Sequence, residues 1–143
     1  MKSKEVQTED QVIDITRTNS IYALSKIVSE QNLRITHQQD MCPVTILRFG
    51  IVYGPRPKNW SAVESLFEAV RTQEVVSVGS LATARRFIHV SDIARGIIKA
   101  IGSKGFEVFN LTGDVLITLR DVIVQSAILL NKQDTQRIVS EGN

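Results

Sequence analysis

Apolar side chains recur at helical spacing in the first third of the chain. From Ser20 onward they stand three, four or seven residues apart, with lysine, glutamate, glutamine and arginine between them. They are Ile21, Leu24, Ile27, Val28 and Ile35. This pattern predicts an amphipathic helix over residues 20–39, with Asn19 or Ser20 as its N-cap. The polar first 18 residues are expected to form an irregular lead-in, and Pro43 ends the helix because it excludes helical geometry at the preceding residue.

A short apolar run rich in β-branched residues follows the proline. The segment Val44-Thr-Ile-Leu-Arg-Phe49 predicts a strand that is buried on both faces, as in a parallel sheet. The next segment, Tyr53-Gly-Pro-Arg-Pro57, requires a loop.

Helical and extended patterns alternate through the rest of the chain. Three further helices are expected, opened by Ser61 with Glu64, by Asp92, and by Thr118 with Asp121, and ending near residues 71, 102 and 130. Strands are predicted over residues 75–78, 86–90 and 107–111. This order of elements predicts an α/β fold with a mostly parallel sheet.

Composition narrows the class of protein. The chain has 143 residues, 43% of them hydrophobic, and a net charge of +2, which suits one globular domain. The near-neutral balance argues against nucleic acid or an anionic membrane as the main partner, and no apolar run is long enough to cross a membrane. Cys42 is the single cysteine, so neither an internal disulfide nor a cysteine-based metal site is expected. A reduced, cytoplasmic protein without a metal site is the expectation.

Tyr22 and Lys26 are the first candidates for chemistry. They stand four residues apart on the predicted helix and therefore share a face, one turn apart. A free phenol, with a pKa near ~10, is a poor acid or base at neutral pH, whereas an ammonium nearby favours the phenolate. A tyrosine tuned in this way can exchange a proton with a substrate hydroxyl. The same spacing also arises by chance in many helices, where it marks a packed ring beside a solvated amine.

Three further motifs follow this pair along the chain. They are Leu47-Arg-Phe-Gly-Ile-Val-Tyr-Gly-Pro-Arg56, Arg85-Arg-Phe-Ile-His-Val-Ser-Asp92 and Val108-Phe-Asn-Leu-Thr-Gly113. Together with Tyr22-Ala-Leu-Ser-Lys26, they resemble the C-terminal half of the extended short-chain dehydrogenase/reductases, in particular the NAD-dependent epimerase/dehydratase family that acts on nucleotide sugars. The resemblance spans about residues 9–130.

The resemblance implies a fold and a division of the chain. The fold is a partial Rossmann-type, doubly wound parallel sheet that lacks its N-terminal nucleotide-binding strands and carries a small C-terminal substrate-binding region. Residues 1–56 and 86–113 would belong to the dinucleotide-binding sheet, and residues 57–85 and 114–143 to the substrate-binding region.

The resemblance also implies roles at the cofactor. The tyrosine matching Tyr22 is the family's catalytic acid/base, and the lysine matching Lys26 also bonds to the nicotinamide ribose. Both residues are therefore expected to be catalytic and to contact NAD or NADP. The loop after the predicted strand would bring its backbone to the nicotinamide and the sugar. Its residues are Phe49, Gly50, Ile51 and Val52.

The substrate-binding expectations rest on two arginines. Arg85 occupies the position whose arginine grips the substrate diphosphate in the family, and its planar fork suits phosphate oxygens. Arg56 is a second, weaker candidate for the same anion. The sequence departs from the family at Ile51, where an asparagine is common, and at Arg86, where an aspartate is usual. These departures leave the identity of the substrate open.

Three other polar residues have structural interpretations that rank ahead of functional ones. Arg48 is interpreted as a buried, satisfied arginine at the end of a strand rather than as a ligand contact. His89 is interpreted as structural, and Asp92 first as a helix cap.

The glycine-rich turn that holds the pyrophosphate in this family is not found in the sequence. The eight glycines do not show the spacing Gly-x-x-Gly-x-x-Gly, and none precedes Tyr22. Three explanations stay open: a fragment or truncated product of a full enzyme, which is favoured, a chain that pairs with a partner supplying the nucleotide-binding half, or a shortened non-catalytic module. A homodimer is also compatible with the resemblance.

The expected activity follows from the family. It is that of an NAD-dependent nucleotide-sugar epimerase/dehydratase-type oxidoreductase, in which NAD oxidises a sugar hydroxyl to a keto intermediate, in a truncated form that is inactive alone. The alternative is a non-catalytic remnant that acts as a binding or interaction module. A chain that stands alone is expected to expose apolar surface and an open sheet edge, and so to be marginally stable, self-associating or partner-dependent.

Overall fold

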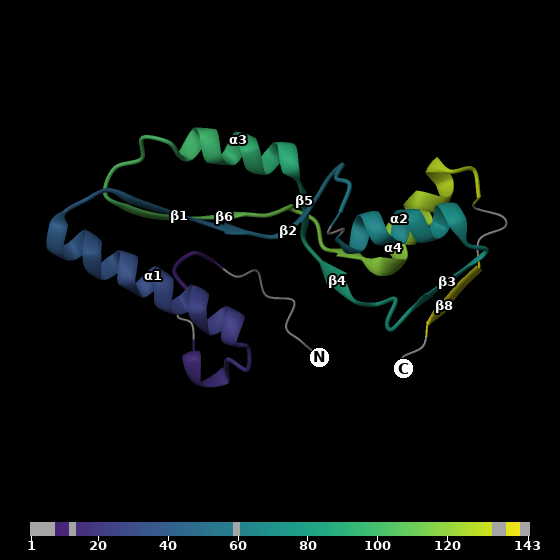
Figure 1. Cartoon of the computed structure of the whole chain (residues 1–143), viewed down its shortest axis with the longest axis horizontal. Coiled ribbons are helices and arrows are strands. Elements are labelled where there is room, and N and C mark those ends of the chain that lie inside the picture. Colours follow the sequence, from purple (N-terminus) through teal and green to yellow (C-terminus); the bar gives the residue numbers. More distant parts are fainter. Residues whose placement is uncertain (1–7, 12–13, 59–60, 133–136, 141–143) are drawn as a thin grey trace. The chain divides into compact units, whose positions relative to one another are not determined.

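The computed structural model describes residues 8–11, 14–58, 61–132 and 137–140, and it divides into two compact units (Figure 1). The first unit comprises Met1–Arg48 and Gly96–Asn110, and the second comprises Phe49–Arg95 and Leu111–Asn143. This division follows packing, so the assignment of segments to dinucleotide-binding and substrate-binding regions stays a prediction. Each unit is described by itself.

A long helix dominates the first unit. After the short 3-10 helix η1 (Ile15–Arg17), α1 (Ile21–Asp40) begins behind Ser20, whose side chain accepts a hydrogen bond from the amide of Ala23 at 3.4 Å. The predicted helix and its cap are thereby confirmed. Met41 ends the helix in the left-handed conformation, with φ of 53°.

One strand pair lies beside this helix. Strand β1 (Val44–Phe49) pairs with β6 (Phe106–Leu111). The amide of Val44 donates to the carbonyl of Gly105 at 2.8 Å, and that of Gly50 donates to Leu111 at 2.9 Å. The partner residue moves forward along β6 as the donor moves forward along β1, so the two strands run parallel. The last turns of α3 (Val90–Ala100) lie on the side of the pair opposite α1 (Figure 1).

The first unit has little core. Of its described residues, Ile46 is the one buried hydrophobic side chain, and α1 has no buried residue over its 20 positions. The expectation that β1 is buried on both faces is therefore wrong for this chain: its other residues are at least partly exposed, with Phe49 at 50%. The physical reason is that β1 has a neighbour on one edge alone among the described strands, which is too little structure to cover two faces.

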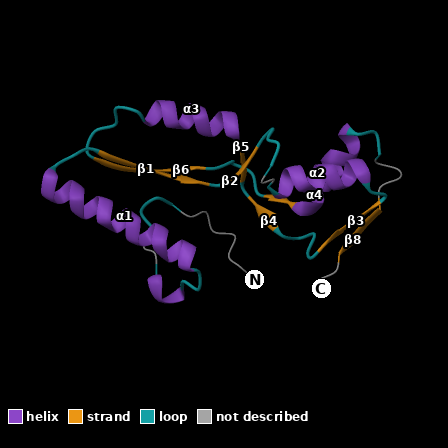
Figure 2. Cartoon of the chain, viewed as in Figure 1, coloured by secondary structure: helices purple, strands orange, loops and turns teal. Residues whose placement is uncertain are grey.

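The second unit combines two whole helices and the start of α3 with short strand pairs (Figure 2). The whole helices are α2 (Ala62–Thr72) and α4 (Leu119–Leu129). Two strand pairs are parallel: β2 (Ile51–Tyr53) with β5 (Phe87–His89), and β3 (Val75–Val78) with β8 (Arg137–Ser140). The third pair, β4 (Ala84–Arg85) with β7 (Ile117–Thr118), is antiparallel. The order of helices and short, mostly parallel strands confirms the α/β class.

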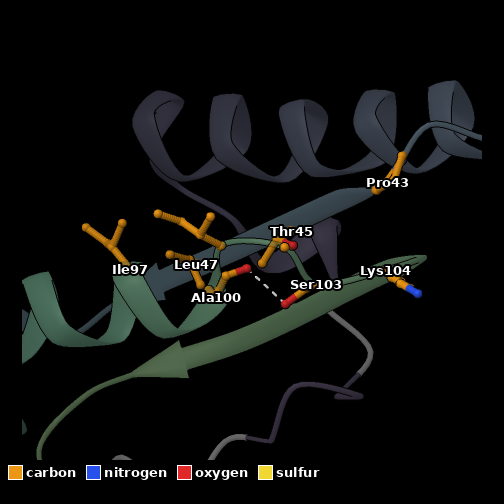
Figure 3. A pocket seen from close by; sticks show the side chains of 9 residues that line it. Pro43, Thr45, Leu47, Ile97, Ala100, Ser103 and Lys104 are labelled. Carbon is orange, nitrogen blue, oxygen red and sulfur yellow. Dashed lines mark hydrogen bonds between the residues drawn. The ribbon is translucent and has the colours of Figure 1, made fainter.

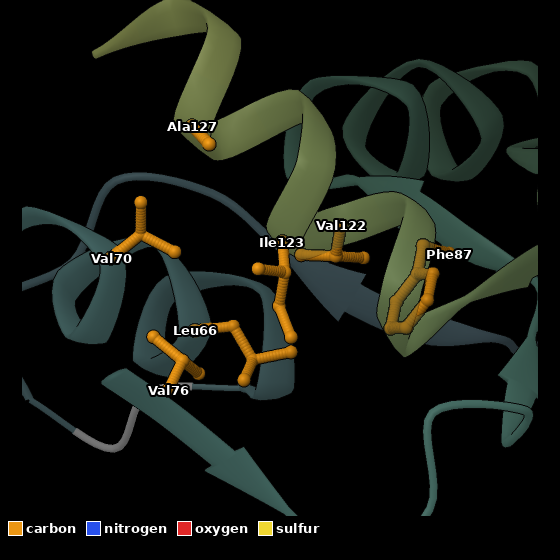
Figure 4. Packing of buried hydrophobic residues seen from close by; sticks show 7 residues of the cluster. All are labelled: Leu66, Val70, Val76, Phe87, Val122, Ile123 and Ala127. Atoms are coloured by element: carbon orange, nitrogen blue, oxygen red, sulfur yellow. The ribbon is translucent and has the colours of Figure 1, made fainter. Parts of the chain in front are cut away.

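The hydrophobic core lies in this second unit (Figure 4). Facing side chains of α2, α4, β3 and β5 form one buried cluster, consisting of Leu66, Val70, Val76, Phe87, Val122, Ile123 and Ala127. Val70 and Ile123 are 0% exposed. Full burial of such aliphatic side chains contributes about 1.5–3 kcal/mol each, so this cluster supplies most of the hydrophobic stabilisation of the described residues.

Two of the three expected helix starts are confirmed. The side chain of Ser61 and that of Thr118 each bond to the N3 residue of the following helix, and the N3 carboxylate bonds back, which completes two capping boxes. The expectation that Asp92 caps a helix is wrong, because α3 begins directly after β5, at Val90. Asp92 lies in the first turn instead, where it pairs with Arg95 and complements the positive end of the helix dipole.

Candidate functional site

Tyr22 and Lys26 lie together on the first two turns of α1. Lys26 Nζ is 5.2 Å from the centroid of the Tyr22 ring, the arrangement that spacing of four residues along a helix produces. Tyr22 is 72% exposed, so its ring is not packed into a core. The phenol is therefore accessible to a ligand and has a cation beside it.

The segment expected near the nicotinamide forms a junction between two strand pairs. Gly50 follows the end of β1 and donates its amide to Leu111, at the end of β6. The next amide, that of Ile51, donates to the carbonyl of Arg86 at 3.2 Å, where β2 begins its pairing with β5. The backbone of residues 49–52 is thus fixed by hydrogen bonds on both sides of the junction, while Phe49 and Ile51 are half exposed.

The two adjacent arginines of the third motif have different surroundings. Arg85 ends β4 and is exposed, and its guanidinium donates to the carbonyl of Ala84 at 2.8 Å. Arg86, in contrast, donates to the carbonyls of Gly113, at 3.2 Å, and Asp114. Arg86 therefore fixes the turn after β6, a role that its sequence position alone did not indicate, whereas Arg85 stays the candidate for an anion.

Arg56 lies in a loop that is tied to the start of α2. Its Nε is 3.3 Å from a carboxylate oxygen of Glu64, and its Nη2 is 3.5 Å from the carbonyl of Val52. Glu64 also accepts hydrogen bonds from the amides of Gly54, at 2.8 Å, and Ser61, at 2.7 Å. Partial burial opposes ionisation of Glu64, but the bonds from Ser61, Gly54 and the helix backbone outweigh it and lower its pKa to about 2.

The sequence indicated Glu64 as a capping residue and did not indicate this second role. The signal for the cap is local, because Ser61 and Glu64 are three residues apart. The contact with Gly54 spans ten residues and becomes visible in the tertiary structure alone.

The structural interpretation of Arg48 is supported. Arg48 donates two hydrogen bonds to the carboxylate of Glu30 on α1, at 2.9 and 2.6 Å, and this contact raises its pKa. His89 bonds to the hydroxyl of Ser91 at 2.8 Å and packs edge-on against Tyr53, at 5.3 Å between ring centroids. These contacts account for both side chains without a ligand.

The predicted site residues divide between the two units. Tyr22 and Lys26 belong to the first unit, and Arg56, Arg85 and residues 49–52 belong to the second. Within each unit their local positions are compatible with the expected roles. Their meeting around one nicotinamide and one sugar stays a prediction.

Two hollows lie in the first unit, and neither is lined by Tyr22 or Lys26. One, of about 550 Å³, is lined by β1 and the end of α3, and its walls are mostly apolar (Figure 3). The hydroxyl of Ser103 there already donates to the carbonyl of Ala100 at 2.9 Å. The other, of about 650 Å³, contains the Arg48–Glu30 pair. Neither presents a group poised for catalysis.

Within the part of the chain that the structure describes, metal and membrane sites were sought as well. No group of three or more histidine, cysteine, aspartate or glutamate side chains gathers there as a metal site would require. None of the described helices combines the length and the apolar character needed to span a bilayer.

Comparison with known proteins decides the family. The sequence model of the "NAD dependent epimerase/dehydratase family" matches residues 2–112, which is most of the chain. The chain belongs to this family. Its α/β arrangement is accordingly that of the Rossmann-like epimerase fold, of which it holds a part.

The sequence is also similar to individual bacterial proteins. The chain is 31% identical over 84 residues to a protein of Bacillus subtilis named an uncharacterized UDP-glucose epimerase, YtcB, a match that covers 58% of this chain and 27% of that one. It is 24% identical over 126 residues to the dTDP-4-dehydro-6-deoxy-D-allose reductase of Streptomyces bikiniensis, covering 85% of this chain and 39% of the reductase.

The fold similarity extends along almost the whole chain. The UDP-glucuronic acid 4-epimerase from Bacillus cereus, solved in complex with UDP-glucuronic acid and NAD, superposes with a TM-score of 0.80 at 24% identity, over 96% of this chain and 44% of that one. The chain thus spans less than half the length of each of these epimerase/dehydratase relatives.

Proposed function

We propose that this chain supplies the proton-transfer pair and the nucleotide-sugar contacts of an NAD-dependent nucleotide-sugar epimerase/dehydratase-type oxidoreductase. The observation that carries the proposal is the exposed phenol of Tyr22 with the ammonium of Lys26 one turn away. Membership of the family supplies the reaction class. By the resemblance of its motifs, Tyr22 takes the position of the family's catalytic acid/base and Lys26 that of the lysine that assists it.

The proton step assigns one task to each residue. When bound, NAD would supply the hydride acceptor for the carbon that bears the sugar hydroxyl, so that the sugar is oxidised there to a keto sugar. Tyr22 would accept the proton of this hydroxyl and would return it when the hydroxyl is regenerated. Lys26 would place its ammonium beside the phenol and contact the nicotinamide ribose. A positioned acid/base of this kind contributes about 10²–10⁴-fold to a rate.

The residues fit one end of NAD. The exposed side chains of Tyr22 and Lys26, in the first unit, are proposed to contact the nicotinamide ribose. The hydrogen-bonded backbone of residues 49–52, in the second unit, is proposed to approach the nicotinamide and the sugar. The pyrophosphate end needs a Gly-x-x-Gly-x-x-Gly turn, a spacing that the eight glycines of this sequence do not show. We infer that a nucleotide-binding half of the family type completes the site, and that the chain by itself does not bind NAD tightly.

The substrate class is a nucleotide sugar. The named relatives act on UDP-glucose, UDP-glucuronic acid and a dTDP-sugar by their names, so the diphosphate is the shared feature. Arg85, exposed at the end of β4, is proposed to hold it through charge-assisted hydrogen bonds. Because the names of the relatives include both epimerases and a reductase, the proposal extends to oxidation of the sugar hydroxyl and not to the later fate of the keto sugar.

The decisive experiment compares the two tyrosines of the chain. The chain is joined to the glycine-rich half of the Bacillus cereus epimerase, and reduction of NAD by UDP-glucose or UDP-glucuronic acid is followed by NADH fluorescence. Tyr22→Phe is expected to lower the rate at least 100-fold. Tyr53→Phe is the matched control, because the Tyr53 ring packs against His89 and is expected to keep the rate.

The outcomes separate the possible roles. Unchanged turnover in Tyr22→Phe would remove this residue from the mechanism. Nucleotide-sugar binding without any NADH signal in the joined protein would favour the alternative of a non-catalytic binding module. Micromolar binding of NAD by the chain alone would contradict the need for a second half.

The single free cysteine, Cys42, fits a reduced compartment, and we propose the cytoplasm.

A further inference from the structure

Glu64 makes more contacts than a helix cap requires. As the N3 residue of the α2 capping box, it accepts hydrogen bonds from the amide and the hydroxyl of Ser61. Through its other oxygen it also accepts a bond from the amide of Gly54 at 2.8 Å. That amide belongs to the Tyr53-Gly-Pro-Arg56 loop, so one carboxylate fastens the loop to the first turn of α2.

The same carboxylate oxygen holds the side chain that leaves this loop. Oε1 of Glu64 lies 3.3 Å from Nε of Arg56, with the two side chains 15% and 36% exposed. A guanidinium is a rigid planar fork with five N–H donors. The Nε contact with Glu64 and the Nη2 contact with the carbonyl of Val52, at 3.5 Å, together set the direction of the guanidinium plane. An exposed arginine with a flexible side chain has no such fixed direction.

We propose that Glu64 is a positioning residue: it fixes the Tyr53–Arg56 loop and aims the Arg56 guanidinium at the diphosphate of the nucleotide sugar. This inference rests on the proposed function, since it takes the substrate class from there. The low pKa of Glu64 keeps its charge in place at every pH at which the enzyme would work. Arg56 is thus an anion contact whose geometry is set from α2, and Arg85 is the independent one.

A purely structural role for Glu64 makes a different prediction, and the chain contains the matched control. Asp121 forms the same capping box at the start of α4, where it accepts bonds from the amide of Thr118 at 2.9 Å and from its hydroxyl at 2.6 Å. Both carboxylates stabilise a helix start, but Glu64 alone of the two also bonds to the loop of Arg56.

The test measures the affinity of the chain for UDP by NMR titration, and the melting temperature in parallel. Glu64→Ala is expected to weaken UDP binding about five- to tenfold, the size of ordinary coupling between residues in contact. In an Arg56→Ala background the same substitution is expected to change the affinity less than twofold, because the side chain that it positions is gone. Both Glu64→Ala and Asp121→Ala are expected to lower the melting temperature, because each removes a capping box. Asp121→Ala is expected to leave the affinity for UDP within twofold of the wild type.

Glu64→Gln guards against a variant that fails to fold. Glutamine keeps an oxygen for one of the two amides, that of Gly54 or that of Ser61, and has no charge for Arg56. It is therefore expected to melt between the wild type and Glu64→Ala and still to lose UDP affinity. Equal affinity losses in Glu64→Ala and Asp121→Ala, or an undiminished loss in the Arg56→Ala background, would overturn the role of Glu64. Absence of UDP binding by the wild type at 10 mM, on the order of the weakest specific affinities, would overturn the proposed substrate class and this inference with it.

Discussion

Arg48 of β1 donates two hydrogen bonds, of 2.9 and 2.6 Å, to the carboxylate of Glu30 on α1. This pair joins the helix that carries Tyr22 to the strand beside it. The side chains are 27% and 20% exposed, so the pair is sheltered from water on most sides. Among the described residues of the first unit, Ile46 is the one buried hydrophobic side chain. The Arg48–Glu30 pair is therefore expected to contribute much of the contact between α1 and β1.

Removal of Arg48 is therefore expected to loosen α1. Arg48→Ala leaves a half-buried carboxylate without its partner, which costs about 1–3 kcal/mol. The expected result is faster hydrogen exchange of the α1 and β1 amides, measured residue by residue. Arg71→Ala is the control, since the Arg71–Glu68 pair is more exposed, at 57% and 31%, and such surface pairs contribute about 0–1 kcal/mol. Equal exchange rates in the two variants would contradict the importance of the Arg48 pair.

Acid is expected to weaken the second unit through Glu64. Its pKa falls from an ordinary value of 4.5 to about 2 in the folded chain. A group with a depressed folded pKa contributes stability above its unfolded pKa and loses it as the pH falls toward the folded one, so this contribution disappears between about pH 4.5 and pH 2. Urea unfolding from pH 6 to pH 3 is expected to show a smaller decline in Glu64→Gln than in the wild type. Equal declines in the two proteins would show that protonation of Glu64 does not contribute to the pH dependence of the free energy of unfolding.

Gly113 is expected to tolerate no side chain. A Cβ atom there would lie 2.2 Å from the carbonyl oxygen of Phe87, inside van der Waals contact with a backbone atom that a strand holds in place. Gly113→Ala is expected to lower the free energy of unfolding by about 2 kcal/mol or more, as overpacking does. Gly79→Ala, with nothing within 4 Å of the new atom, is the control and is expected to change stability by less than about 0.5 kcal/mol. Similar losses at the two sites would argue against the close approach.

The core of the second unit supplies a prediction about packing. Ile123 is 0% exposed, whereas Leu129 on the same helix is 74% exposed. Ile123→Ala is expected to cost about 2–5 kcal/mol, because it removes buried methyl groups and leaves a cavity. Leu129→Ala is expected to cost less than about 0.5 kcal/mol. Thermal unfolding of the two variants checks this, and a comparable loss at Leu129 would mean that another chain covers that face of α4.

Much of the local structure was predictable from the sequence because local interactions decide it. The spacing of apolar residues placed α1 to within a residue or two, and the capping boxes of Ser61 and Thr118 marked two helix starts. The pair of Tyr22 and Lys26 followed in the same way, since a helix brings residues four apart together without help from the rest of the chain. The strands β2, β4, β7 and β8 were not predicted, because two to four residues carry too short a pattern.

The sequence by itself determined which segments form α-helices, where most of them start, and that Tyr22 and Lys26 share a face of α1, because these features depend on neighbours within one or two turns. Only the tertiary structure decided that Glu64 contacts Gly54 and Arg56, that Arg86 holds the turn at Gly113, and that none of the residues of α1 is buried. Those features depend on which distant segments approach one another, and hydrophobic periodicity does not encode a partner. The exposure of α1 has the same origin. An amphipathic pattern identifies the face of a helix that can be buried, but the residues that bury it come from other segments.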